Sequence, residues 1–201
     1  MQRTVDFKSG DLGRFATLVV DANRKINLVS RSGDVRGEID RQIRLSRAIL
    51  PLLPQKYLDR ELDWFDIGSG GGFPAIPLAI ERPQDRFLLV EAIAKKAFFL
   101  ERTAFELKLT NVEVLKDRIE QVIAGSIPTK RKIDIVTIKA VAGLQASLSW
   151  ASEILKSDGL LVTYKTADEA TEDVAFELIV DQEVTELSGS NDLRIMIFKK
   201  K

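Results

Sequence analysis

Apolar residues near the N-terminus recur at helical spacing. Between Asp11 and about Ser30 they fall on one face: Leu12, Phe15, Leu18, Val19, Ala22 and Ile26. This spacing predicts an amphipathic helix, and Asp11 could cap its start. A similar pattern over residues 34–53 predicts a second helix, whose end is marked by Pro51 and Pro54.

From residue 62 onward, short apolar runs alternate with helical patterns. We expect strands at 62–67, 86–91, 112–115, 133–138, 159–165, 178–186 and 193–199. We expect helices at 74–82, 94–109, 117–124, 143–156 and 168–176. Alternating strands and helices predict an α/β fold with a parallel sheet. The last two strands follow one another without a helix, which predicts one antiparallel strand in a seven-stranded, mostly parallel sheet.

A glycine-rich loop follows the first predicted strand, in the stretch Asp66-Ile-Gly-Ser-Gly-Gly-Gly-Phe-Pro-Ala-Ile-Pro77. Glycines let the backbone approach a ligand closely, and Pro74 is suited to the start of the helix that follows. The next strand ends on Glu91, about twenty residues further on, where a carboxylate can bind ribose hydroxyls. The stretch therefore predicts a site for a nucleoside cofactor.

The identity of the cofactor depends on the residues that flank the glycines. Gly70-x-Gly72-x-x-Ala75 satisfies the dinucleotide pattern, so an NAD-dependent oxidoreductase is one alternative. Asp66, however, would repel a pyrophosphate and attract a sulfonium with its α-amino group. Pro74 also removes a backbone N–H that a phosphate would use. Both residues favour S-adenosylmethionine, and the predicted topology is that of class I methyltransferases.

Composition narrows the possible chemistry. The 201 residues include no cysteine and no histidine, which excludes disulfides, thiolate zinc sites and cysteine nucleophiles, and no metal site is indicated. Net charge is zero, but residues 1–60 carry 12 Lys+Arg against 7 Asp+Glu, and the remainder carries 18 against 23. The excess of basic residues in the N-terminal part is equally consistent with binding to nucleic acid and with a solvated helix surface. Without a membrane-length apolar run or a signal-peptide core, we expect a cytoplasmic protein.

The glycine loop resembles one family closely, the bacterial 16S ribosomal RNA guanine-N7 methyltransferases, also called glucose-inhibited division protein B. Gly68-Ser-Gly-Gly-Gly-Phe-Pro-Ala-Ile-Pro77 departs from that family's loop only at Ala75. The likeness continues through further segments: Asn27–Ser30, Glu91–Lys96, Asp117–Glu120 and Thr137–Leu144. We therefore expect a Rossmann-like methyltransferase domain at 61–201 with an N-terminal helical segment, 1–60, packed on it.

The resemblance implies roles for matching residues. Gly68 and Phe73 would line the cofactor loop, and Glu91 would bind the ribose. The Ile119–Glu120 pair would bracket the adenine. Lys139 stands where the family carries an arginine at the junction of cofactor and substrate, so it is our candidate catalytic residue.

The departures from the family cluster on the presumed substrate side. The family's Arg-His-x-x-Asp-Ser element reads Arg41-Gln-Ile-Arg-Leu-Ser46 here. A Lys-Gly pair reads Lys165-Thr166, and a C-terminal Arg-His pair reads Leu193-Arg194. The basic residues at these places are our candidates for substrate contact: Arg41, Arg44, Lys165 and Arg194.

Methyl transfer to guanine N7 needs no general base, because this nitrogen has a free lone pair and no proton to lose. The reaction can rest on alignment and desolvation, which suits a chain without histidine or cysteine. The leading hypothesis is therefore methylation of guanine N7 in 16S ribosomal RNA, free or in the small subunit, by a monomer. Two alternatives stay open: a methyltransferase of another RNA or a small molecule, and a non-catalytic RNA- or protein-binding homologue.

Overall fold

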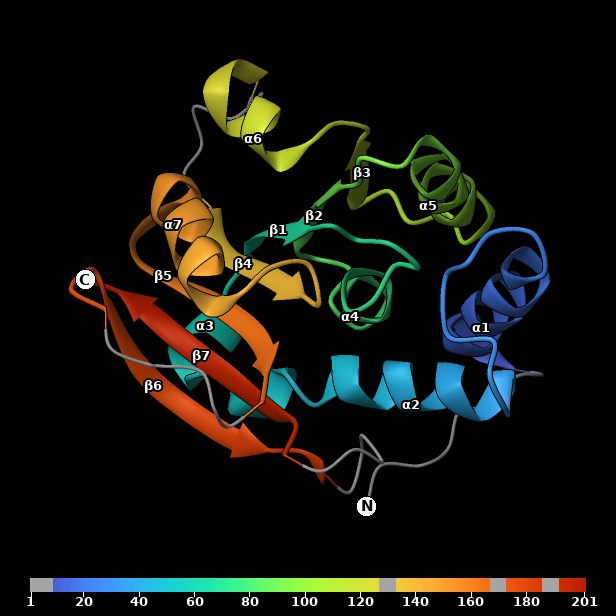
Figure 1. Ribbon diagram of the computed structural model, residues 1–201, viewed down its shortest axis with the longest axis horizontal. Coiled ribbons are helices and arrows are strands. Elements are labelled where there is room, and N and C mark those ends of the chain that lie inside the picture. Colours follow the sequence, from blue (N-terminus) through green and yellow to red (C-terminus); the bar gives the residue numbers. More distant parts are fainter. Residues whose placement is uncertain (1–8, 127–132, 167–172, 186–191) are drawn as a thin grey trace.

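A seven-stranded sheet forms the centre of the computed structural model, in the order β3-β2-β1-β4-β5-β7-β6 (Figure 1). The structure describes residues 9–126, 133–166, 173–185 and 192–201. Strands β1 to β5 run parallel, and β7 pairs antiparallel with both β5 and β6. The predicted topology is confirmed, including the antiparallel strand near the C-terminus.

The elements have the following bounds. The strands are β1 Asp63–Ile67, β2 Arg86–Val90, β3 Val112–Leu115, β4 Ile133–Lys139, β5 Leu155–Lys165, β6 Phe176–Glu183 and β7 Arg194–Lys200. The α-helices are α1 Gly10–Asn23, α2 Val35–Arg47, α3 Gln55–Leu58, α4 Ala75–Glu81, α5 Ala94–Glu106, α6 Ile119–Gln121 and α7 Leu144–Ile154. A 3-10 helix, η1, covers Leu50–Leu52, and a π-helical turn, η2, covers Val122–Ser126.

Alternate residues of the strands are buried in two hydrophobic cores, one on each face of the sheet. Trp64 of β1 belongs to a core that also contains buried residues of the helices α1, α2, α4 and α5, among them Ile43 and Leu100. Phe65, the next residue, packs on the other face with the α7 residues Leu148 and Ala151. This two-residue period is the expected result of burying both faces of a parallel sheet.

The N-terminal helices are shorter than predicted. Helix α1 ends at Asn23 and not at Ser30, because the buried Asn23 side chain accepts the backbone N–H groups of Leu28 and Val29 at 2.8 and 3.1 Å and turns the chain. Its N-cap is Ser9, so the prediction that Asp11 caps the helix is wrong.

The second helix, α2, begins after Asp34, whose side chain accepts the N–H of Arg36 at 3.0 Å as an N-cap. It ends at Arg47, and the 3-10 turn η1 takes up part of the predicted remainder. The short helix α3 was not predicted. Pro51 in η1 and Pro54 at the start of α3 explain why the predicted long helix is replaced by shorter helical segments.

The predicted helix at 168–176 is not supported. Residues 168–172 lie outside the described part of the chain, residues 173–175 are not helical, and Phe176 begins β6. The predicted helix at 117–124 is reduced to α6 followed by the π-helical turn η2.

The helices before β1 share one core with the sheet. Phe15 of α1 and Ile39 of α2 are fully buried in the same cluster as Leu89 and Ile135 of the sheet. Tyr164 of β5 donates its hydroxyl to the carbonyl of Leu45 in α2 at 2.9 Å. The division at residue 60 remains a prediction. Helix α1 lies against α2, α4 and α5, so it joins the shared core through these helices (Figure 1). None of the helices in the described segments is both long and apolar enough to cross a membrane.

Candidate active site

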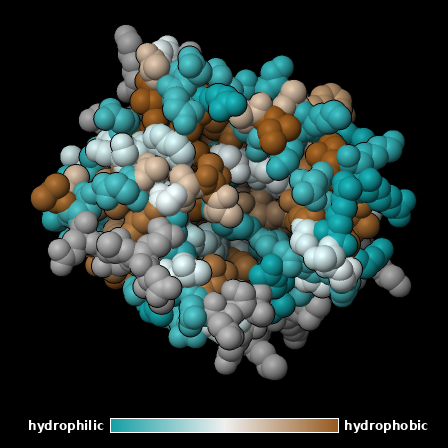
Figure 2. All heavy atoms as spheres, in the orientation of Figure 1, coloured by the Kyte–Doolittle hydropathy of each residue, from teal (hydrophilic) through white to brown (hydrophobic). Residues whose placement is uncertain are grey.

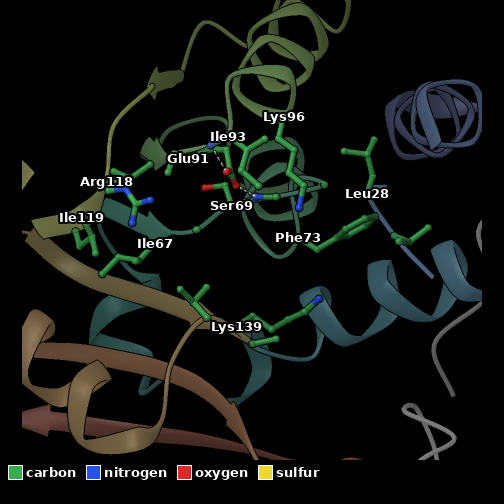
Figure 3. Close-up of a pocket in the computed structure, with 18 of the residues that line it drawn as sticks. Leu28, Ile67, Ser69, Phe73, Glu91, Ile93, Lys96, Arg118, Ile119 and Lys139 are labelled. Carbon is green, nitrogen blue, oxygen red and sulfur yellow. Dashed lines mark hydrogen bonds between the residues drawn. The ribbon is translucent and has the colours of Figure 1, made fainter. Parts of the chain in front are cut away.

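One cavity of about 620 Å³ lies at the carboxyl edge of the sheet, where β1, β2 and β4 end. Strand order reverses between β1 and β4, since β2 and β3 lie on one side and β5 on the other. Ligands of open α/β sheets bind at such a point because the loops diverge there. The space-filling view is hollowed near its centre (Figure 2), and Figure 3 shows the side chains around the cavity.

The glycine loop after β1 forms the floor of the cavity through Gly68, Gly70 and Gly71, whereas Gly72, also predicted to bind the cofactor, does not line it. Gly68, Gly70 and Gly72 have φ values of 69°, 55° and 88°, a region that side-chain-bearing residues avoid. A Cβ on Gly68 would lie 2.5 Å from the Val141 side chain, and one on Gly71 would lie 3.0 Å from the carbonyl oxygen of Leu28. The loop therefore requires glycine both for its conformation and for close packing.

Glu91, at the end of β2, holds this loop in place. Its two carboxylate oxygens accept the backbone N–H groups of Gly70 at 2.8 Å and Ile93 at 2.7 Å (Figure 3). The side chain is 5% exposed and lines the cavity. A carboxylate has about four acceptor positions, so it can also accept hydroxyl groups of a ligand.

Asp66 is placed differently from Glu91. It is 2% exposed, lies beneath the loop and is absent from the cavity lining. The Thr137 hydroxyl donates to its Oδ1, while Oδ2 has no partner among the described residues. Burial raises the pKa of Asp66, and hydrogen bonds from Thr137 and Ser69 and the charge of Lys139 oppose this rise. Its predicted attraction for a cationic ligand would act through the loop.

The end of the cavity formed by the loop after β3 is lined by both apolar and charged side chains. Ile67 and Ile119 lie near each other at this end, and Arg118 lies in the same region (Figure 3). Trp150 of α7 also lines the cavity, as does Glu120. The resemblance predicted that Ile119 and Glu120 bracket an adenine; both residues line the cavity, and their role toward an adenine remains a prediction.

Lys139 lies at the opposite end of the cavity, at the carboxyl end of β4. Its ammonium donates to the side-chain oxygen of Gln42 in α2 and stands 5.5 Å from the ring centre of Phe73 and 5.8 Å from that of Tyr164. Burial lowers the pKa of Lys139 from 10.5 to about 8, and the charge of Asp66 opposes this effect. A charged donor thus lines the wall opposite Glu91.

The four basic residues predicted to contact substrate do not line the cavity. Arg41 and Arg44 form ion pairs within α2, with Glu38 at 2.6 Å and Asp40 at 2.9 Å.

Lys165 and Arg194 are register partners in β5 and β7, so the structure brings these two together. Lys165 donates to the carbonyl of Ala142 at 2.5 Å, in the loop that follows Lys139, and Arg194 pairs with Asp181. The substrate roles of all four basic residues remain predictions.

Several cavity residues were not assigned a role from the sequence: Leu28, Glu38, Gln42, Ile93, Lys96, Arg118, Val141 and Trp150. The residues that neighbour the glycine loop, Glu91 or Ile119 in the sequence could have been found from the rule that ligands bind in the crevice at the carboxyl ends of the strands. Gln42 lies in the Arg41–Ser46 element that the resemblance placed on the substrate side, so that element was the signal for it. No sequence signal identifies Glu38 or Trp150, because the packing of α2 and α7 brings them to the cavity.

Residues 8–199 match the family described as rRNA small subunit methyltransferase G. The chain belongs to this family.

Two of its relatives carry the name ribosomal RNA small subunit methyltransferase G. The relative from Polynucleobacter asymbioticus is 35% identical over 169 residues, which cover 83% of this chain and 74% of the relative. The relative from Helicobacter hepaticus is 39% identical over 114 residues, 57% of this chain and 60% of that protein. The family predicted from the loop motif is confirmed.

Solved structures agree on the fold. A putative O-methyltransferase from Klebsiella pneumoniae superimposes with a TM-score of 0.64 at 13% identity, over 96% of this chain and 90% of that one. A precorrin-6y C5,15-methyltransferase from Geobacter metallireducens gives a TM-score of 0.53 at 17% identity, over 87% and 90% of the two chains. The Rossmann-like methyltransferase fold is therefore shared across substrates.

Proposed function

We propose that this chain is an S-adenosylmethionine-dependent methyltransferase that modifies N7 of a guanine in 16S ribosomal RNA. The observation that carries the proposal is one cavity with a glycine floor tied to a carboxylate, Glu91, and a charged donor, Lys139, on the opposite wall. The names of the family and of its relatives support the RNA target.

The residues present fit the cofactor. The Cβ position of Gly70 is free of side chains within 4 Å, so a ligand can lie against the backbone there. Glu91 would accept the ribose hydroxyls, and the part of the cavity lined by Ile67 and Ile119 would hold the adenine. When bound, the cofactor supplies a methyl group on a sulfonium, which is activated for displacement.

The protein itself would position the reacting groups and exclude water from them. Phe73 and Val141 would exclude water from one side of the reacting region, because both line the cavity. Lys139 would donate to an acceptor atom of the base, such as guanine O6 next to N7. Guanine N7 needs no proton removed, and the described residues around the cavity supply none of the usual histidine or cysteine bases.

The test is methyl transfer with defined substrates. Purified protein is incubated with tritiated S-adenosylmethionine and either 30S subunits or naked 16S ribosomal RNA, both from a strain whose corresponding gene is deleted. We expect label in 7-methylguanosine after digestion, and about a hundredfold less with Glu91→Ala. Label in another nucleotide or another RNA would overturn the proposed target. Binding of S-adenosylhomocysteine without transfer to either substrate would favour the non-catalytic homologue.

A further inference from the structure

Gln42 of α2 stands between two charged residues of the cavity wall. Its side-chain oxygen accepts from the Lys139 ammonium, and its side-chain nitrogen donates to Glu38 Oε1 at 2.7 Å. All three residues line the cavity. A carboxamide can accept at one end and donate at the other, so Gln42 matches both neighbours at once.

The charges that face Lys139 come from two elements. Glu38 and Arg41 lie on α2, and Asp66 lies on β1. Arg41 binds Glu38 through Nε at 2.8 Å and Nη2 at 2.6 Å, so the Glu38 carboxylate is shared between Arg41 and Gln42. Glu38 opposes the loss of the Lys139 charge, whereas Arg41 favours it.

A lysine in this position needs such support. Its side chain has four rotatable bonds, so an unsupported ammonium would sample many positions. Burial also disfavours its charged form, which lowers the pKa of Lys139 to about 8. Phe73 and Tyr164 offer ring faces near the ammonium, and the Tyr164 hydroxyl is engaged with the carbonyl of Leu45.

We propose that Gln42 is a positioning residue: it fixes the Lys139 ammonium at the cavity wall and couples it to the Glu38 carboxylate, so that Lys139 stays charged and aimed at an acceptor atom of the nucleobase. The last part rests on the proposed function, because it assumes that a nucleobase enters beside Lys139. The hydrogen bonds that link Glu38, Gln42 and Lys139 do not depend on that assumption, because they lie within the protein.

The first experiment measures the Lys139 ammonium without any substrate. Protein labelled with ¹³C-lysine is titrated by NMR through its Cε–Hε signals, and Lys139→Arg assigns the signal. Gln42→Leu should lower the titration midpoint and Gln42→Glu should raise it, each by roughly one pH unit. Glu38→Gln should lower it as well.

Gln55→Leu is the matched control, because Gln55 donates to Asp59 at 2.7 Å across the same four-residue spacing on the exposed helix α3. It should leave the Lys139 midpoint unchanged. Equal midpoints in wild type, Gln42→Leu and Gln42→Glu would overturn the coupling. Gln42→Glu keeps a polar side chain of similar size, so the test survives if Gln42→Leu does not fold.

The second experiment measures methyl transfer to 30S subunits across pH. Gln42→Leu should lower kcat about tenfold at pH 7, with a smaller change in the KM for S-adenosylmethionine, and should move the alkaline limit of kcat down in pH. Gln42→Glu should move that limit up. An unchanged alkaline limit in both variants would overturn the role toward the substrate. If wild type binds S-adenosylhomocysteine but transfers no methyl group, the proposed function fails while the NMR result still decides the coupling.

Discussion

The two walls of the cavity are held by different kinds of contact. The glycine-loop wall is fixed through the backbone: Glu91 accepts two main-chain N–H groups, and Gly68 packs against Val141. The wall formed by α2 is fixed through side chains, since Gln42 is hydrogen-bonded both to Glu38 of the same helix and to Lys139 of β4. The close backbone contacts of the loop allow few residue types at its positions. A series of hydrogen bonds between side chains, in contrast, can be formed by other polar residues.

This difference matches the chain's likeness to its family. The loop wall departs from the family motif only at Ala75, whereas the other wall carries Gln42 and Lys139 in place of the residues expected from the resemblance. We infer that the loop wall tolerates substitution poorly and the α2 wall tolerates it when its polar contacts are kept.

The largest effect is expected for Gly68→Ala. The new Cβ would lie 2.5 Å from Val141, at a φ of 69° that alanine avoids, so the loop must shift. Affinity for S-adenosylhomocysteine, measured by calorimetry, should fall by roughly a hundredfold or more. Gly33→Ala is the control, because Gly33 has a φ of 81° with nothing within 4 Å of its Cβ position. Equal affinities in the two variants would show that the loop wall tolerates a side chain at Gly68.

Glu91→Ala should have the next largest effect. It removes the acceptor of the Gly70 and Ile93 N–H groups, and hydrogen bonds to a charged group are worth about 1.5–3 kcal/mol. We expect affinity for S-adenosylhomocysteine to fall by roughly 10- to 100-fold in the same titration. Glu113→Ala, at an exposed position of β3, should change it less than about twofold. A Glu91→Ala protein with wild-type affinity would show that the loop holds itself.

Lys139→Met separates stability from function in the α2 wall. Because the folded-state pKa is about 8 against 10.5 in the unfolded chain, the charged form is disfavoured in the folded state. The variant should gain about 1–2 kcal/mol in the free energy of unfolding at pH 7, allowing for partial solvent access. Between pH 8 and 10.5 the Lys139 amine is mostly neutral in the folded chain and charged in the unfolded chain. The free energy of unfolding of the wild type therefore rises with pH in this range, and the advantage of Lys139→Met should shrink.

Urea denaturation at pH 7 and pH 10 measures this difference, with Lys116→Met at an exposed site as the control. Methyl transfer by Lys139→Met should be strongly reduced despite the gain in stability. A loss of stability at pH 7 would mean that the contact with Gln42 outweighs the cost of burying the ammonium.

The smallest effect is expected at Trp150, which lines the cavity from α7, while the other tryptophan, Trp64, is buried in the core. S-adenosylhomocysteine should change the emission of Trp150 and not that of Trp64. Trp150→Phe should abolish the fluorescence response while changing affinity less than about threefold, since an aromatic wall is kept. A response that persists in Trp150→Phe would place the ligand elsewhere.

The sequence by itself determined the order of strands and helices, the antiparallel strand and the position of the ligand loop. These features are local: hydrophobic period, a glycine run after a buried strand, and Glu91 at the end of the next strand. Local patterns failed at helix ends, where Asn23 turns the chain by binding the N–H groups of residues five and six positions later. They also failed at 168–176, where the described end of that segment, Phe176, pairs with Lys200 in the sheet.

Only the tertiary structure decided the second wall of the cavity. Gln42 and Lys139 are 97 positions apart, and no spacing rule links residues of a helix before the sheet to the end of its fourth strand. It also distinguished the two loop carboxylates, since Glu91 reaches the cavity and Asp66 is buried beneath it. The physical reason is that long-range packing, which sets what each side chain contacts, depends on all the buried faces together.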